Sequence, residues 1–194
     1  MCISTDETLK LALLNLDEFA IYSGLSDKRE IEKKAALYVV QKVLENTSIQ
    51  IQYHQSGRPY LHNGTKISVS HAYDKLAVLF CFTGQEIGVD VEKVRDKILK
   101  IKEKFLSHTE LKELENASLQ KHTLYWAVKE AVYKACNTQG LLFAEQIAIE
   151  PFVYNENGGT IAASVKKPDS EKKYTLHYQI LNGYVLAYTD NKSE

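Results

Sequence analysis

Hydrophobic and polar positions follow two different periods along the first half of the chain. A mostly apolar run from Leu9 to Leu16 predicts a short buried strand. From Ser26 to about Glu45 the apolar residues recur at helical spacing, which predicts a long helix with Ser26 as its N-cap. Apolar runs of strand length then alternate with turn residues, so we expect short strands over 67–70, 76–82 and 87–92.

The second half of the chain begins with helical patterns and ends with strands. Apolar spacing predicts a helix over 98–105, and Ser107 with Glu110 has the form of a capping box for a second helix. A third helix is expected over 123–136. Strands are predicted over 147–153, 160–165, 174–180 and 184–189, the last two as a hairpin around Asn182-Gly183.

This order of elements predicts an α+β fold. Each half reads as a strand, a helix and then several strands, although no residue-level repeat relates the two halves. We therefore divide the chain into an N-terminal half, 1–95, and a C-terminal half, 96–194.

Composition narrows the classes of function. The 194 residues carry 24 Lys+Arg and 25 Asp+Glu, a net charge of -1, which argues against a general nucleic-acid binder. No apolar run approaches the ~18 residues of a membrane span, and the first residues lack the pattern of a secretory signal. Cysteines at 2, 81 and 136 offer neither a disulfide framework nor zinc spacing, so we expect a cytoplasmic protein with reduced thiols.

Two acidic residues lie on one face of the strand predicted over 87–92. Because side chains alternate along a strand, Asp90 and Glu92 point the same way, roughly 6.5–7 Å apart. Carboxylates this close repel each other unless a cation lies between them, and Mg2+ prefers such hard oxygen ligands. A solvated strand end shows the same alternation, so this pattern alone leaves both interpretations open.

The helix predicted over 123–136 carries a second polar pattern along the border of its apolar stripe. Trp126, Glu130 and Lys134 are spaced four residues apart and therefore share one side of the helix. One interpretation is an ordinary surface ion pair between Glu130 and Lys134. The other places both in a cleft between the halves, where Glu130 joins the two acids of the strand and Lys134 meets a phosphate.

Two further stretches carry less information on their own. Gly57-Arg58-Pro59 is a stiff turn that presents a cation, although an ordinary hairpin turn fits it equally well. Ser70-His71 ends a predicted strand, and a single His is more often structural than functional. Nothing in the sequence orients a base against a nucleophile, as a Ser-His-Asp or Cys-His arrangement does.

Together, the order and spacing of these motifs resemble the 4'-phosphopantetheinyl transferase superfamily, and most of all its surfactin-synthetase-activating class. The specific part is Gly-Val-Asp-Val-Glu at 88–92 followed, about forty residues on, by Trp-Ala-Val-Lys-Glu-Ala-Val-Tyr-Lys at 126–134. Gly-Arg-Pro at 57–59, Ser-Val-Ser-His at 68–71 and Phe-Leu-Ser at 105–107 complete the series. The resemblance, which spans 85 residues from 57 to 141, implies two similar α+β halves packed as a pseudo-dimer.

The resemblance implies an enzyme of the holo-[acyl-carrier-protein] synthase type. Such an enzyme moves the 4'-phosphopantetheine group of coenzyme A to a serine of an apo acyl or peptidyl carrier protein and releases adenosine 3',5'-bisphosphate. Mg2+ would be its cofactor and coenzyme A its co-substrate. We expect a monomer, because both sides of the cleft come from one chain, and no nucleic-acid or membrane partner.

The site residues that the family pattern implies fall into three groups. Asp90, Glu92 and Glu130 would hold Mg2+. Glu130 would also take or relay the serine proton, and Lys134 would lie against the pyrophosphate. The remaining cofactor contacts would be Arg58 and Pro59 on the adenine side, Ser70 and His71 at the 3'-phosphate, and Lys129 close to the pyrophosphate.

A few positions depart from the family pattern. Arg58 stands where Lys is common, and the two are not equivalent at a phosphate. Ser68 and Ala72 replace the usual Asn and second Ser, and Thr138 replaces the first Gly of a Gly-x-Gly-Leu loop. The charged set itself is complete, which favours an active enzyme. The alternatives are a non-catalytic module that binds coenzyme A or a carrier protein on the same fold, and a pyrophosphate hydrolase, whose Glu-rich helix is not seen here.

Overall fold

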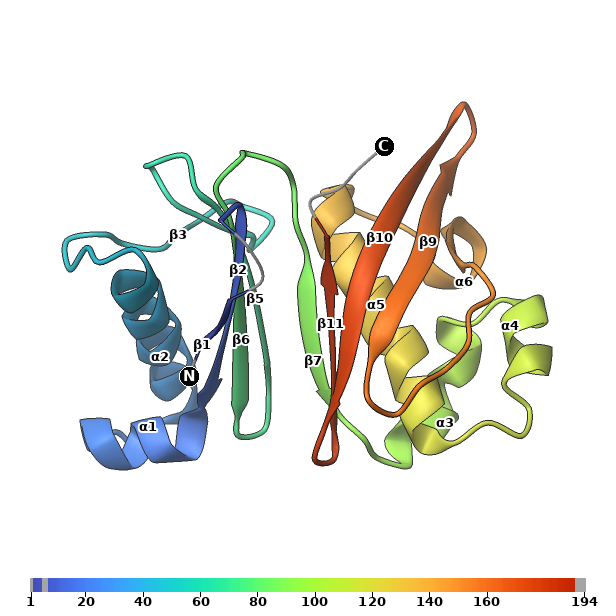
Figure 1. Ribbon diagram of the computed structural model, residues 1–194, viewed down its shortest axis with the longest axis horizontal. Coiled ribbons are helices and arrows are strands. Elements are labelled where there is room, and N and C mark those ends of the chain that lie inside the picture. The colour runs from blue at the N-terminus through green and yellow to red at the C-terminus, as the bar shows by residue number, and fades with distance from the viewer. Residues whose placement is uncertain (1, 5–6, 191–194) are drawn as a thin grey trace.

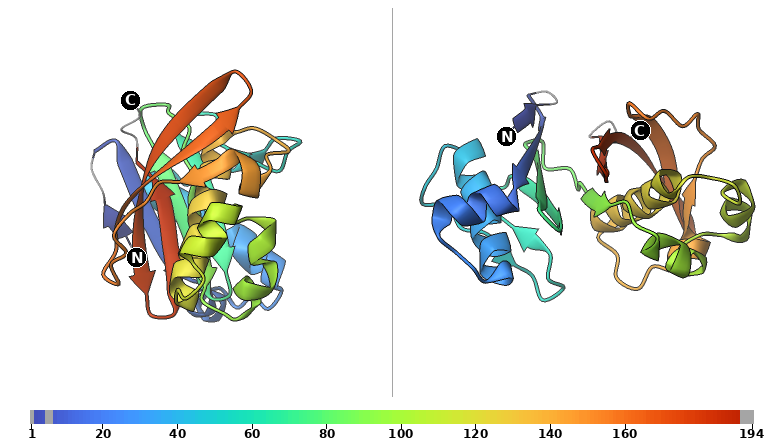
Figure 2. Two further views of the ribbon diagram at one scale, coloured as in Figure 1. Left: turned by 90° about the vertical axis from the view of Figure 1, so that its right-hand side faces the viewer. Right: turned by 90° about the horizontal axis from the view of Figure 1, so that it is seen from below.

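Two antiparallel sheets face each other in the middle of the molecule, and helices cover their outer sides (Figure 1; Figure 2). The computed structural model describes residues 2–4 and 7–190. Its helices and antiparallel strands confirm the predicted α+β class. None of the helices in these ranges combines the length and the hydropathy that crossing a membrane requires.

The N-terminal half is a four-stranded sheet covered by two helices. Its strand order is β1 (Cys2–Ser4), β2 (Leu9–Asn15), β6 (Lys75–Cys81) and β5 (Lys66–Ala72). Helices α1 (Leu16–Ser23) and α2 (Lys28–Val43) pack on one face through a core that includes Val39, Val78 and Phe80. A separate ribbon, β3 (Gln52–Tyr53) and β4 (Pro59–Tyr60), is joined by the turn that carries Arg58.

The C-terminal half is a five-stranded sheet packed on one long helix. Its strand order is β7 (Val89–Lys93), β11 (Tyr184–Thr189), β10 (Ser170–Leu181), β9 (Gly159–Lys167) and β8 (Ile147–Ile149). Helix α5 (Leu119–Cys136) packs on this sheet through a stripe that includes the fully buried Ala127, Val128 and Ala131. The short helices around α5 are α3 (Lys97–Ile101), η1 (Lys102–Lys104), α4 (His108–Glu113) and α6 (Phe143–Gln146).

The helix starts agree only in part with the predicted ones. Helix α2 is capped by Asp27 rather than Ser26, since the Asp27 carboxylate accepts a hydrogen bond from the first turn at 2.8 Å. The sequence pattern does not predict α1, which begins directly after β2 with Asn15 as its cap. The capping box of Ser107 and Glu110 at the start of α4 is confirmed.

Strand β7 belongs to the C-terminal sheet, although we expected Asp90 and Glu92 to end the sheet of the N-terminal half. It pairs with β11, so that Asp90 lies opposite Ala187. The division between the sheets therefore falls before residue 89 rather than after residue 95. Alternation along a strand defines its two faces and not its neighbours, which is why the pattern could not assign β7 to a sheet.

An apolar layer holds the two sheets together. Leu11 and Leu79 of the N-terminal sheet lie in one cluster with Val89 and Leu186 of the C-terminal sheet, and all four are fully buried. Burying one such side chain contributes about 1.5–3 kcal/mol. The inner faces of the two sheets thus form a third core, between the separate cores of the halves.

Two serines of β5 bind the open edge of β7. The hydroxyl of Ser68 accepts a hydrogen bond from the N–H of Val89 at 3.1 Å, and the hydroxyl of Ser70 accepts one from the N–H of Val91 at 3.3 Å. These N–H groups point away from β11, so the serines satisfy backbone donors that would otherwise be buried without partners. The seam fixes β7 against the N-terminal half without continuing the sheet.

Gly88 allows α5 to pack very close to the start of β7. A Cβ atom at this position would lie 1.8 Å from the carbonyl oxygen of Ala131, a backbone atom of α5. The backbone of Gly88 is also fixed from the other side, because its N–H donates to the hydroxyl of Thr189 at 3.0 Å. The absence of a side chain therefore sets the distance between β7 and α5.

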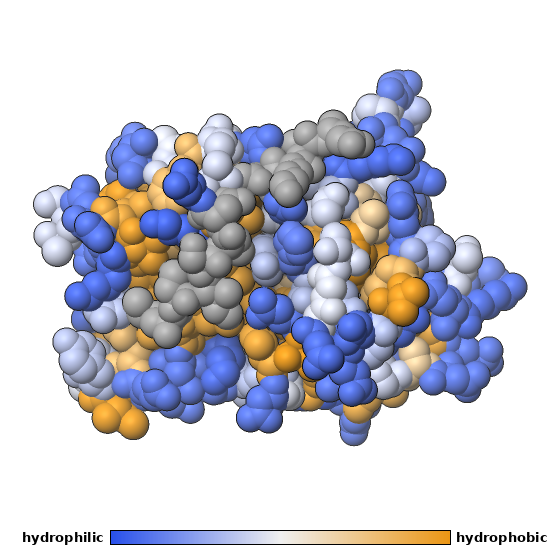
Figure 3. All heavy atoms as spheres, in the orientation of Figure 1, coloured by the Kyte–Doolittle hydropathy of each residue, from blue (hydrophilic) through white to orange (hydrophobic). Residues whose placement is uncertain are grey.

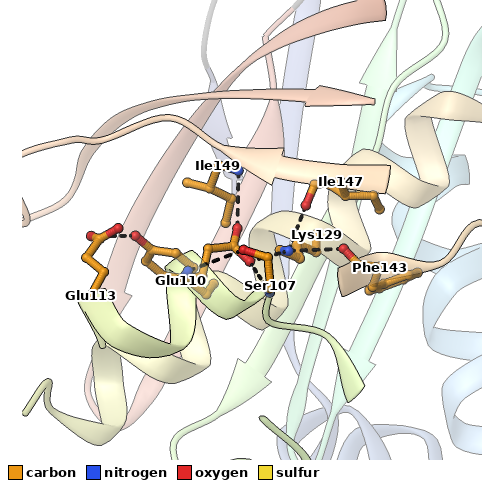
Figure 4. A network of polar contacts seen from close by, with 8 residues as sticks. Ser107, Glu110, Glu113, Lys129, Phe143, Ile147 and Ile149 are labelled. Atoms are coloured by element: carbon orange, nitrogen blue, oxygen red, sulfur yellow. Dashed lines mark hydrogen bonds and ion pairs between the residues drawn. The ribbon is translucent and has the colours of Figure 1, made fainter. Parts of the chain in front are cut away.

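A buried ion pair connects α5 with α4 inside the C-terminal half (Figure 4). Lys129 is fully buried, and its Nζ lies 2.7 Å from a carboxylate oxygen of Glu110. The same Nζ donates to the carbonyl oxygens of Phe143 at 3.1 Å and Ile147 at 2.7 Å. Burial lowers the pKa of Lys129, and the neighbouring Glu110 charge opposes that shift. All three N–H donors of the ammonium are thus used inside the core.

We expect Gly88→Ala to lower the free energy of unfolding by at least ~3 kcal/mol, because the added methyl overlaps a backbone carbonyl and overpacking costs this much or more. Thermal unfolding should show a Tm lower by roughly 6–12 °C. Gly84→Ala is the control, since Gly84 has a φ of +81° but its added Cβ would meet no described atom within 4 Å. The control should lose only ~1–2 kcal/mol to its left-handed backbone. Equal losses would contradict the role of Gly88 in helix packing.

Lys129→Met should lower the free energy of unfolding by ~3–5 kcal/mol, because it leaves the buried Glu110 carboxylate without its cation. Urea unfolding measures this loss. Lys34→Met is the matched control, because Lys34 forms an exposed ion pair with Glu30 on α2 at 2.8 Å, and such pairs contribute less than ~1 kcal/mol. An unchanged urea midpoint for Lys129→Met would show that the pair does not stabilise the fold.

Candidate active site at the junction of the two halves

Asp90 is buried between the two halves, and its two oxygens have different surroundings. Oδ1 accepts hydrogen bonds from the hydroxyl of Ser70 on β5 and from Nζ of Lys134 on α5, both at 2.7 Å. Lys134 also donates to the carbonyl oxygen of Val89 at 2.9 Å. Oδ2 is buried and has no hydrogen-bond partner within the described ranges. One oxygen of Asp90 thus accepts hydrogen bonds from both halves, and the other oxygen has no partner among the described residues.

Glu92 and Glu130 extend this polar cluster. Glu92 accepts a hydrogen bond from the indole N–H of Trp126 at 2.9 Å. Burial raises the pKa of Glu92, and the negative charge of Asp90 raises it further. Burial likewise raises the pKa of Glu130, to about 7, with a further contribution from Asp90. Strand β7 and helix α5 therefore bring three carboxylates within electrostatic reach of one another.

The cluster contains more acid than base, which bears on whether it fits a metal ion. In the described part of the chain, no three His, Cys, Asp or Glu side chains form a ready-made metal-binding group. Trp126 and Lys134 donate to two of the carboxylates instead. The unpartnered, buried Oδ2 of Asp90 and the mutual repulsion of the acids fit a hard divalent cation such as Mg2+. Asp90, Glu92 and Glu130 are the residues that could hold it.

A cavity of about 400 Å³ lies beside Lys134 and has walls from both halves. The N-terminal half contributes the turn with Gly57, Arg58 and Pro59, together with part of β5. The C-terminal half contributes the end of α5 and the residues after it: Tyr133, Lys134, Asn137, Thr138 and Gln139. An adjoining cavity of about 390 Å³ shares Arg58, Pro59 and Asn137 with the first. The arrangement can accept an elongated ligand whose one end reaches the acidic cluster.

Arg58 is held in the wall of this cavity by a carboxylate from the segment between β6 and β7. It forms an ion pair with Glu86, and Glu86 also pairs with Lys66 at 2.9 Å. Although burial opposes the shift, the Lys66 and Arg58 cations lower the pKa of Glu86. The turn that carries Arg58 is thereby tied to the connection between the two halves.

Three of the predicted cofactor contacts lie away from the cavity. Ser70 is buried, and its hydroxyl is bonded to Asp90 and to the backbone of β7. His71 is exposed, and its Nδ1 lies 3.3 Å from a carboxylate oxygen of Glu32 on α2. Lys129 departs furthest from our expectation, because it lies on the buried side of α5 and uses all of its donors in the core.

Sequence reasoning gave no role to several residues of this site. Trp126 lies four residues before Glu130 and therefore on the same side of α5. This spacing could have indicated that Trp126 reaches the acidic cluster, where it donates a hydrogen bond to Glu92. Thr138 lies two residues beyond Cys136, the last residue of α5, and helical spacing therefore could not indicate its place in the cavity wall. No local pattern in the sequence predicts the contact of Glu86, because its partner Arg58 is 28 positions away in the chain.

The part of the chain that forms this cluster is similar in sequence to known proteins. Residues 86–189 match the family described as the 4'-phosphopantetheinyl transferase superfamily, a match of more than half the chain that includes β7, α5 and every acidic residue of the cluster. The chain is also 26% identical over 153 residues to the 4'-phosphopantetheinyl transferase Sfp of Bacillus subtilis (strain 168). That alignment covers 76% of this chain and 65% of its relative, so the chain spans less than two thirds of that protein's length. From the family match, this chain belongs to the 4'-phosphopantetheinyl transferase superfamily.

Proposed function

We propose that this protein transfers the 4'-phosphopantetheine group of coenzyme A to a serine of an apo acyl or peptidyl carrier protein. The serine oxygen forms a new bond to the phosphorus next to the pantetheine arm. The bond from that phosphorus to the anhydride oxygen breaks, and adenosine 3',5'-bisphosphate leaves. This is an activity of the holo-[acyl-carrier-protein] synthase type, and the similarity to the Sfp transferase supports its general class.

The observation that carries the proposal is the acidic cluster next to two adjoining cavities, each lined by residues of both halves. Lys134 belongs to the cluster and to the first of these cavities, since it donates to Asp90 and lines that cavity. A pyrophosphate at this point would meet a cation on one side and oxygen ligands for a metal on the other. Phosphoryl transfer depends mostly on positioning and on stabilising charge at the phosphate oxygens, which is what such a cluster supplies.

The residues of the cluster take separate parts in this proposal. Asp90, Glu92 and Glu130 hold Mg2+, which when bound neutralises charge on the pyrophosphate. Lys134 contacts the pyrophosphate. Glu130 takes the serine proton, directly or through one water. Ser70 acts through Asp90, because its hydroxyl fixes the orientation of that carboxylate.

The remaining contacts follow from the cavity walls. Arg58 and Pro59 line the side where we propose that the adenine of coenzyme A binds. Lys129 has no donor left for the cofactor and stabilises α5 instead. Because both walls come from one chain, a monomer is sufficient for activity, and we propose that the protein acts as one.

Glu130→Gln should slow transfer at least ~100-fold, since it removes a carboxylate that this proposal assigns to both metal binding and proton transfer. The intact mass of an apo carrier protein, taken after incubation with coenzyme A and Mg2+, measures the transfer. The Tm should stay within a few degrees of the original, because Gln matches Glu in shape.

Glu115→Gln provides the matched control, because Glu115 is exposed and lies outside the cluster. It should transfer at the original rate. If Glu130→Gln also kept that rate, its proposed roles would be wrong. If the unsubstituted protein bound coenzyme A but modified none of a panel of apo acyl and peptidyl carriers, the non-catalytic binding module would be favoured.

A further inference from the structure

The indole of Trp126 contacts one of the three carboxylates of the cluster, and the proposed function gives it no part. Its Nε1–H donates a hydrogen bond to Oε1 of Glu92 at 2.9 Å. Of the two oxygens of Glu92, only this one receives a hydrogen bond from the described part of the chain. Trp126 therefore occupies one oxygen of Glu92 and leaves the other for a further partner.

Aromatic packing fixes the direction of this indole N–H. The ring of Phe105, which is fully buried, meets the indole edge to face, with the ring centroids 5.1 Å apart. The ring of Phe143 packs against the same indole, with a centroid distance of 5.6 Å. The hydrogen bond to Glu92 is thus oriented by packing within the C-terminal half and does not depend on solvent.

The neighbouring acid of β7 shows the same division between its two oxygens. Oδ1 of Asp90 accepts hydrogen bonds from Ser70 and Lys134, whereas the buried Oδ2 has no partner among the described residues. Asp90 and Glu92 therefore each have one oxygen bonded to the protein and one that is not. A cation at the cluster would meet each of these carboxylates through a single oxygen.

One-oxygen carboxylates suit some divalent cations better than others. Mg2+ takes about six oxygens in strict octahedral geometry, usually with only one or two carboxylates and several waters. Ca2+ is larger, takes about six to eight oxygens, and often binds both oxygens of a carboxylate at once. A donor that occupies one oxygen of a carboxylate therefore costs Ca2+ a ligand and costs Mg2+ none.

We propose that Trp126 restricts Glu92 to one-oxygen coordination and thereby makes the cluster select Mg2+ over Ca2+. Trp126 is a positioning residue in this role, because it acts through Glu92 and touches neither the cation nor the substrate. The inference rests on the metal site of the proposed function. The observation specific to it is the packed indole, whose single donor points at one carboxylate oxygen.

Calorimetric titration of the full chain with MgCl2 and, separately, with CaCl2 tests this role, with coenzyme A present and no carrier protein. Trp126→Phe keeps an aromatic ring and removes the donor. The affinity for Mg2+ should fall roughly tenfold, since losing a partner that orients a metal ligand has effects of this size. The affinity for Ca2+ should fall less than about twofold or rise, because Glu92 can then offer both oxygens. The preference for Mg2+ should thus drop at least about fivefold.

Tyr125→Phe is the matched control on the same helix. The hydroxyl of Tyr125 donates to Oε1 of Glu113 at 2.7 Å, so this change also removes one aromatic donor from a carboxylate, but outside the cluster. Hydrophilic residues occupy much of the face shown in Figure 3, and exposed acids elsewhere bind both cations weakly. The control shares that background and should keep the original preference. Thermal unfolding checks that both variants are folded.

The fluorescence of the unsubstituted protein gives a second readout. Trp126 is the single tryptophan of the chain, so the indole signal reports on this position alone. Mn2+ prefers oxygen ligands as Mg2+ does, and it is paramagnetic. With coenzyme A present, Mn2+ should quench the indole, and Mg2+ should reverse the quenching at lower concentration than Ca2+. An unquenched indole in protein that calorimetry shows to bind Mn2+ would place the cation away from Glu92 and overturn the inference.

The other outcomes separate this inference from the proposed function. If the unsubstituted protein bound Ca2+ as tightly as Mg2+, or if Trp126→Phe changed both affinities by the same factor, Trp126 would not determine selectivity. Should the unsubstituted protein still modify a carrier in that case, the proposed function would stand without this role. If it bound neither cation in the presence of coenzyme A, the metal site and this inference would fall together.

Discussion

One buried carboxylate, Asp90, constrains how the two halves fit together. Removing a charge from water costs several kcal/mol unless hydrogen bonds and an opposite charge replace the lost solvent. Here the hydroxyl of Ser70 comes from the N-terminal half and the ammonium of Lys134 comes from α5, and both reach the same oxygen. The cluster is therefore complete only when the halves are docked. Gly88 makes this possible, since any side chain there would push α5 away from β7.

The two halves contribute differently to the site. The acidic residues and Lys134 all lie on β7 and α5, within the C-terminal half, where the Lys129–Glu110 pair fixes α5 to its neighbours. The N-terminal half contributes the serines that bind β7 and the turn that carries Arg58. This division explains how a cluster built on one sheet can depend on contacts from the other sheet.

Local patterns predicted much of the fold, and contacts between distant residues decided the rest. The α+β class, the capping box at Ser107 and the side of α5 shared by Glu130 and Lys134 could be predicted, because each depends on spacing within a few residues. The sheet to which β7 belongs could not, since strand pairing is not encoded in alternation. The burial of Lys129 depends on Glu110, which lies 19 positions away, and no helical pattern indicates that pairing.

The most direct test of the account is calorimetric binding of coenzyme A with Mg2+ and again with excess EDTA. If the carboxylates around Asp90 hold a divalent cation against the pyrophosphate, removal of the metal should weaken binding at least tenfold, about 1.4 kcal/mol. The variant Asp90→Asn should lose most of that metal dependence. Its thermal unfolding curve checks that it is folded. Equal affinity for coenzyme A with Mg2+ and with EDTA would contradict the assignment of Asp90, Glu92 and Glu130 as a metal site.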